Sequence, residues 1–115
     1  MSVRAQVFVW TLQRVSAAVL GICVLVHLAT IIYAVRSGLT AAEILGRTTG
    51  SVAWATFYGV FIVATAVHAP IGLRNVIVEH TAWRGRSLDI ALTIVTLWIL
   101  IAGFRAVIAV FGGGA

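Results

Sequence analysis

The sequence predicts an all-α integral membrane protein with three transmembrane helices. Of its 115 residues, 62% are hydrophobic and only 10% are charged, and the mean hydropathy of +1.11 lies far outside the range of soluble proteins. A helix needs about 20 mostly apolar residues to cross the hydrocarbon core. Three stretches satisfy this, at about residues 15–35, 53–78 and 88–111. We therefore expect residues 1–115 to form a single transmembrane domain.

The first span follows Arg4 and Arg14, as the apolar part of a secretory signal would. A signal normally has an apolar run of about 7–15 residues and a cleavage site, whereas this run is longer and no convincing site follows it. We expect the helix to be retained. Cys23, the only cysteine, lies within this span, which excludes an internal disulfide and a cysteine-based metal site. It is expected to be a small buried hydrophobic residue.

The two connections, residues 36–52 and 79–87, are too short to fold as domains. The first contains turn-forming residues and a possible short helix. Any chemistry outside the membrane must therefore be supplied by another polypeptide, and the chain is expected to be a subunit of a complex.

The arginines predict the orientation, because cytoplasmic loops are rich in positive charge. All eight basic residues are arginine, and five flank the N-terminus and the second connection, against three on the other side: Arg4, Arg14, Arg74, Arg84 and Arg86 against Arg36, Arg47 and Arg105. This predicts the N-terminus inside and the C-terminus outside. Trp10, Trp54 and Trp83 lie near predicted span ends, where an indole ring prefers the headgroup layer. No exposed domain is available to bind nucleic acid.

Two histidines, His27 and His68, lie inside predicted spans. An ionisable residue in a membrane helix usually has a function, and neutral imidazole is a natural axial ligand of haem iron. A membrane histidine can also donate a hydrogen bond to a neighbouring helix or belong to a proton path. From the residues alone, all three interpretations remain open.

Helical periodicity places polar residues beside both histidines, since positions 3, 4, 7 or 11 apart share a helix face. One such face holds Gln13, Ser16, Leu20 and His27, with Cys23 beside it, and the other holds His68, Gly72, Asn75 and Glu79. Gly72 is one turn from the second histidine. Its missing side chain would let a flat macrocycle or another helix approach closely.

The second span contains the run His68-Ala-Pro-Ile-Gly72-Leu-Arg74-Asn-Val-Ile-Val-Glu79-His80. This run resembles the second-helix motif of the membrane-anchor cytochrome b subunits of succinate dehydrogenase and fumarate reductase. In that motif a haem-ligand histidine begins H-x-x-x-G-[IL]-R, and an acidic residue follows eleven positions after it. His68, Gly72, Arg74 and Glu79 match, so the resemblance implies that the first three bind haem b, with His68 on the iron.

The first span carries two further matches. Gln13-Arg14-Val-Ser16 is similar to the family's H-R-[VIL]-S-G entry, with glutamine and Ala17 replacing histidine and glycine, and residues 21–28 resemble the first-helix ligand region of the two-haem branch. That branch is a five-helix subunit in which ligands pair between the two halves. The resemblance therefore implies that His27 and His68 ligate different haems. Each then needs a partner histidine from a second anchor subunit or a second copy of this chain.

The resemblance also implies a function. The chain would be a non-catalytic anchor in a bacterial inner (cytoplasmic) membrane, binding a flavoprotein and an iron–sulfur subunit at its inner face and passing electrons between the latter and membrane quinone. Dicarboxylate chemistry would occur on the other subunits. The quinone-site candidates are Gln13, Arg14, Ser16, Glu79 and His80. Arg14 would face a quinone carbonyl, Ser16 would donate a hydrogen bond, and Glu79 with His80 would relay protons.

Several alternatives remain at this stage. The protein could be a haem-free structural anchor whose histidines make interhelical hydrogen bonds, or a proton-transporting subunit. Arg14 and Arg74 could extend to the headgroups or pair with haem propionates. Arg105, inside the third span, has the same two alternatives, and Glu79 and His80 could simply form a solvated helix end. Succinate oxidation and fumarate reduction, with ubiquinone or menaquinone, are all compatible with the sequence.

Overall fold

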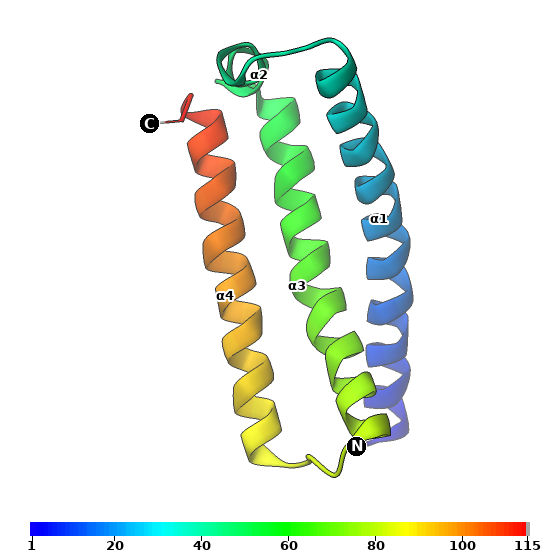
Figure 1. Cartoon of the computed structure of the whole chain (residues 1–115). Coiled ribbons are helices and arrows are strands. Elements are labelled where there is room, and N and C mark those ends of the chain that lie inside the picture. The colour runs from blue at the N-terminus through cyan, green and yellow to red at the C-terminus, as the bar shows by residue number, and fades with distance from the viewer. Residues whose placement is uncertain (115) are drawn as a thin grey trace.

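The computed structural model describes residues 1–114, which form three long helices and one short one. The order is α1 (Val3–Arg36), α2 (Ala41–Thr48), α3 (Val52–His80) and α4 (Arg86–Phe111). The long helices α1, α3 and α4 are each long and apolar enough to cross a membrane. They run alternately up and down, as Figure 1 shows, so the predicted all-α class and three spans are confirmed.

Helix α1 begins well before the apolar run that predicted it. Its first residue is Val3, and the Ser2 hydroxyl caps it by accepting a hydrogen bond from the Ala5 N–H. At ~1.5 Å per residue its 34 residues extend over about 50 Å, whereas the hydrocarbon core is about 30 Å thick. The helix must therefore tilt or project from the bilayer.

Helix α3 lies between α1 and α4 and makes the extensive helix contacts with both. The start of α1, the end of α3 and the start of α4 meet at one end of the bundle, which we call the N-terminal end. The other end, where α1 finishes, α3 starts and α4 finishes, is the C-terminal end. Gln13 of α1 and Gly72 of α3 therefore belong to neighbouring helices.

The contact of α3 with α4 depends on a glycine. A Cβ built on Gly103 would lie 2.6 Å from side-chain atoms of Ile62, closer than real Cβ contacts allow. Further toward the N-terminal end, Leu88 and Leu92 of α4 are buried. Small residues let membrane helices approach closely, and Gly103 does so for this pair.

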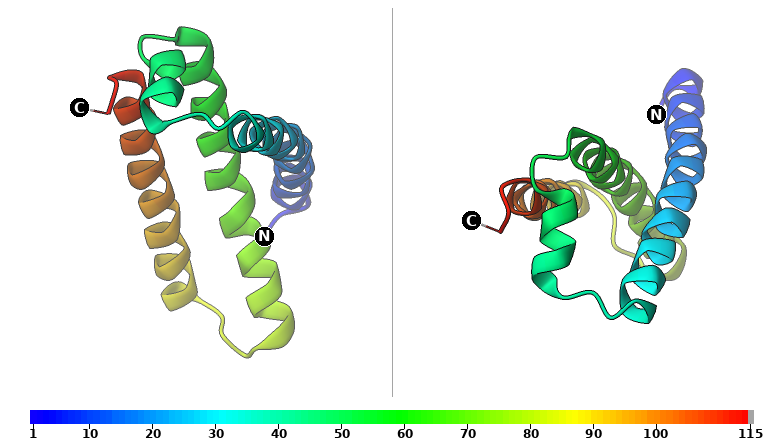
Figure 2. Two further views of the ribbon diagram at one scale, coloured as in Figure 1. Left: turned by 45° about the horizontal axis from the view of Figure 1, so that its top comes forward. Right: turned by 90° about the horizontal axis from the view of Figure 1, so that it is seen from above.

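The short helix α2 closes the C-terminal end of the bundle (Figure 2). The Thr48 hydroxyl donates to the Val110 carbonyl at 3.0 Å, and the Gly50 N–H donates to the Phe111 carbonyl at 2.8 Å. These bonds attach α2 to the last turn of α4. The expected short helix within residues 37–51 is confirmed, and it covers the C-terminal end of the bundle.

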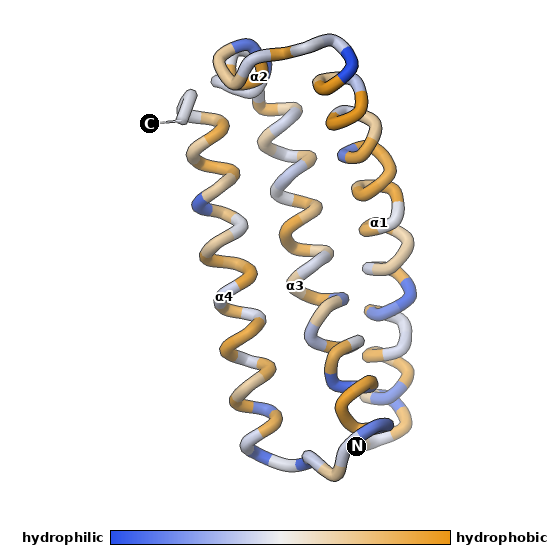
Figure 3. Tube along the Cα trace, viewed as in Figure 1, coloured by the Kyte–Doolittle hydropathy of each residue, from blue (hydrophilic) through white to orange (hydrophobic). Residues whose placement is uncertain are grey.

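Many large apolar side chains of the three long helices are exposed, and the traces of these helices are coloured mainly as hydrophobic in Figure 3. Trp98 is 69% exposed and Ile94 61%. The few buried hydrophobic residues include Cys23, a free cysteine, as expected. Such surfaces require lipid or another subunit around them.

Candidate functional site

His27 lies half-buried between α1 and α3 near the C-terminal end. Its Nδ1 is 3.2 Å from the Tyr58 hydroxyl oxygen, and its ring meets those of Tyr58 and Phe61 edge-on at centroid distances of 5.6 Å. The imidazole also borders two cavities of about 220 and 260 Å³ beneath α2. The ring is therefore held by α3 on one side and borders open space on another.

His68 has a different environment. Its Nδ1 is buried and has no hydrogen-bond partner among residues 1–114. The side chain borders a groove of about 620 Å³ whose α1 wall includes Ala17, Ala18 and Gly21. A buried polar atom without a partner is costly, so this nitrogen calls for a group that the chain alone does not provide.

The two histidines lie at different levels of the bundle. His27 contacts Tyr58, which is ten residues from His68 along α3. At ~1.5 Å per residue this separates the levels by about 15 Å. The described residues also hold no cluster of three or more His, Cys, Asp or Glu suited to a metal ion. Any metal centre at either histidine needs ligands from outside those residues.

Gln13 and Gly72 meet where α1 passes the last third of α3. A Cβ on Gly72 would lie 3.3 Å from Gln13 Nε2, while Gln13 Oε1 is buried without a partner within residues 1–114. Ser16 is buried one turn further along α1, and its hydroxyl donates to the Gln13 carbonyl at 3.1 Å. The shared helix face predicted for these α1 residues is thus the one that packs on α3.

The other quinone-site candidates lie apart from this contact. Arg14 is exposed and its guanidinium lies over the Trp10 ring, 5.1 Å from the centroid, on the side of α1 away from Ser16. Glu79 and His80 are exposed in the last turn of α3. The chain alone therefore brings Gln13, Ser16 and Gly72 together but leaves the rest dispersed.

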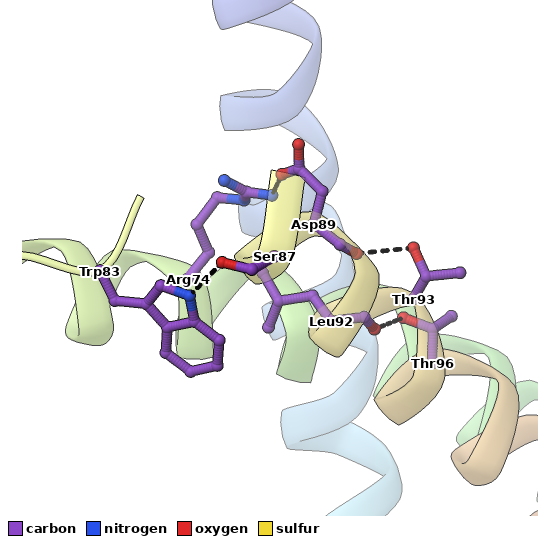
Figure 4. A network of polar contacts seen from close by, with 7 residues as sticks. All are labelled: Arg74, Trp83, Ser87, Asp89, Leu92, Thr93 and Thr96. Atoms are coloured by element: carbon purple, nitrogen blue, oxygen red, sulfur yellow. Dashed lines mark hydrogen bonds and ion pairs between the residues drawn. The ribbon is translucent and has the colours of Figure 1, made fainter. Parts of the chain in front are cut away.

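Arg74 forms an ion pair with Asp89 at the start of α4 (Figure 4). Both side chains are substantially exposed, at 41% and 60%. Trp83 Nε1 donates to the Ser87 hydroxyl at 2.8 Å beside this pair. Sequence reasoning assigned Asp89 no role, although an acidic residue in the first turn of a helix is a recognisable signal. Arg74 connects α3 to α4 here.

Sequence reasoning also missed Tyr58. It belongs to an aromatic cluster of α3 formed by Trp54, Phe57, Tyr58 and Phe61. A tyrosine inside an apolar span carries a hydroxyl that needs a partner, and this was the available signal. Arg105 is exposed on α4 and forms no ion pair with the described residues.

These features define a class: a multi-pass α-helical membrane protein with a histidine in each of two neighbouring spans. A family profile described as "Succinate dehydrogenase/Fumarate reductase transmembrane subunit" matches residues 1–110. The chain belongs to this family, which makes it a membrane subunit of a succinate dehydrogenase or fumarate reductase complex and confirms the resemblance seen in the sequence. No curated protein matches the chain, and no solved structure does.

Proposed function

We propose that this subunit binds b-type haem and passes electrons between the iron–sulfur subunit of its complex and membrane quinone. Haem, when bound, supplies a one-electron carrier within the bilayer. The chain itself carries no dicarboxylate chemistry in this proposal. Its own contribution is to hold haem and quinone at fixed positions in the membrane.

The buried, unpartnered Nδ1 of His68 is the observation that carries the proposal. If one imidazole nitrogen bound the haem iron and the other donated its N–H to a hydrogen-bond acceptor, both ring nitrogens would have a partner. The adjoining groove is open, and its α1 wall combines small residues such as Ala17 and Gly21 with larger aliphatic residues such as Leu25. The small residues leave room for a flat macrocycle beside the imidazole, so the local chemistry fits the group.

His27 is proposed as a ligand of a second haem. Its level in the bundle differs from that of His68 by about 15 Å, which is too far for both rings to ligate one iron atom. A second histidine ligand for each haem would then come from outside this chain, from a second anchor subunit or a second copy. The largely exposed apolar surface of the long helices supports such a partner.

A quinone site is proposed at the N-terminal end, around Gln13 and Ser16. The unpartnered Gln13 Oε1 can accept a hydrogen bond from a quinol hydroxyl, and the buried Ser16 hydroxyl can donate one to a quinone carbonyl in place of its bond to the Gln13 backbone carbonyl. Arg14, Glu79 and His80 remain candidates for charge stabilisation and proton delivery. They would have to meet the quinone at a surface shared with a neighbouring subunit.

The positions of these groups support the proposed orientation. The quinone candidates lie at the N-terminal end of the bundle, which the arginine distribution assigns to the inner face. The iron–sulfur and flavoprotein subunits would bind at that face of a bacterial cytoplasmic membrane. Electrons would then enter on the same side as the quinone site.

Replacing His68 with Ala in the purified complex tests the haem proposal. We expect loss of one haem in pyridine haemochrome analysis, because the iron loses an axial ligand. His80→Ala is the matched control, since His80 is exposed at the end of α3 and should leave haem content unchanged. An unaltered haem content and absorbance spectrum in His68→Ala would disprove the assignment.

A second candidate is a haem-free structural anchor. The hydrogen bond between His27 and Tyr58 favours it, since it joins α1 to α3 as that function requires. Haemochrome analysis of the wild-type complex separates the two candidates, because only the first requires any haem in the anchor.

A further inference from the structure

The Tyr58 hydroxyl is the one side-chain group in residues 1–114 that bonds the His27 ring. Two other hydroxyls nearby, those of Thr30 and Thr48, are already bonded elsewhere. Thr30 donates to the His27 backbone carbonyl at 2.7 Å, and Thr48 donates to the carbonyls of Leu45 and Val110. Tyr58 is therefore placed to fix the ring by its Nδ1 atom, and the edge-on contacts with Tyr58 and Phe61 restrict its rotation.

A neutral imidazole carries a proton on one nitrogen and a lone pair on the other. When one nitrogen binds a metal, the other usually donates its N–H to an acceptor, which fixes the tautomer and raises the basicity of the ligand. The Tyr58 oxygen can accept such a bond from Nδ1. No residue among 1–114 bonds Nε2, and the ring borders two cavities.

We infer that Tyr58 is a positioning residue, whose hydroxyl oxygen accepts a hydrogen bond from His27 Nδ1–H and leaves the lone pair on Nε2 for haem iron. The inference rests on the proposed role of His27 as a ligand. His68 has no corresponding partner within the described chain. The chain thus supplies a hydrogen-bond partner for the ring of one proposed ligand histidine by itself and leaves the other to a neighbouring group.

The consequence is electronic. A ligand imidazole that donates a hydrogen bond is a stronger electron donor and favours the oxidised iron. Tyr58 therefore lowers the midpoint potential of the haem held by His27. Removing only the hydroxyl should raise that potential and leave the other haem unchanged.

Spectroelectrochemical titration of the purified Tyr58→Phe complex tests this. The substitution keeps the ring and its packing, so we expect two haems, an upward shift of one midpoint potential and a changed electron paramagnetic resonance signal of the same haem. Tyr33→Phe is the matched control, because Tyr33 lines the same cavity but lies beside Arg47, not His27. It should move neither potential.

A His27→Ala variant identifies which haem is concerned and separates two failures. If it loses one haem while Tyr58→Phe retains both with unshifted potentials, Tyr58 has no such role and the ligand assignment stands. If His27→Ala retains every haem, the assignment of His27 as a ligand is wrong, and the inference about Tyr58 falls with it.

Discussion

The amide of Gln13 fills the space left by the missing side chain of Gly72, with Nε2 3.3 Å from where a Cβ would stand. This contact joins the two helices that carry the family's motifs. It also gives the glycine a role within the chain. The Gln13 amide of α1 occupies the space beside Gly72, which was predicted to let a flat macrocycle or another helix approach closely.

Replacing Gly72 with Leu should destabilise the subunit, because the larger side chain must displace the Gln13 amide. Overpacking of this kind costs about 1–3 kcal/mol. In the Gln13→Ala background the same substitution should cost less, which denaturant titration of the purified subunit in detergent micelles can measure. Strictly additive free energies of unfolding would show that the two residues are not coupled.

Gly103→Ala is expected to loosen the contact between α3 and α4. The added Cβ would lie 2.6 Å from Ile62 atoms, so the helices must separate or Ile62 must move, at a cost of about 1–3 kcal/mol in the free energy of unfolding. Ile62→Ala should restore part of the loss. Gly46→Ala is the control, because a Cβ there meets nothing within 4 Å. Equal stability of the two alanine variants would contradict the prediction.

The ion pair of Arg74 with Asp89 should contribute little to stability, since its side chains are 41% and 60% exposed. Exposed pairs are typically worth about 0.2–1 kcal/mol. We expect Arg74→Gln and Asp89→Asn to have similar small effects on unfolding, with no further loss in the double variant. Haem content provides a second measurement. Loss of haem in Arg74→Gln alone would instead assign the arginine to the cofactor, as the family motif implies.

Ser16→Ala should weaken quinone binding at the proposed site. Losing one neutral hydrogen bond costs about 1 kcal/mol, so the KM for a short-chain quinone should rise about fivefold with little change in kcat. Thr11→Ala is the control, because its exposed hydroxyl bonds a backbone carbonyl of its own helix, as that of Ser16 does. Similar KM values for both variants would argue against a quinone contact at Ser16.

The sequence predicted what depends on composition and on the helical repeat. Apolar length indicated the three spans, and the 3.6-residue period placed Ser16 and Cys23 on the buried face of α1. Periodicity shows which way a residue faces but not what it meets. The pairs of Arg74 with Asp89 and His27 with Tyr58 join residues 15 and 31 positions apart, so they depend on how neighbouring helices align.

Arg14 shows that a match to a family motif also does not identify what a residue meets in the folded chain. A match to a family motif made it a quinone-site candidate, although it lies outside the polar face that includes Ser16. In the folded chain it is exposed beside Trp10. Its proposed role thus depends on a surface that only an assembled complex would provide.

The bonds between α2 and α4 also bear on how the protein is made. They join Thr48 and Gly50 to Val110 and Phe111, so they cannot form until α4 has been synthesised. During synthesis the first two long helices can already pair while the cavities beside His27 lack this attachment. Enclosure of that end of the bundle thus comes after the pairing of α1 with α3, and removal of the last turn of α4 would leave it open.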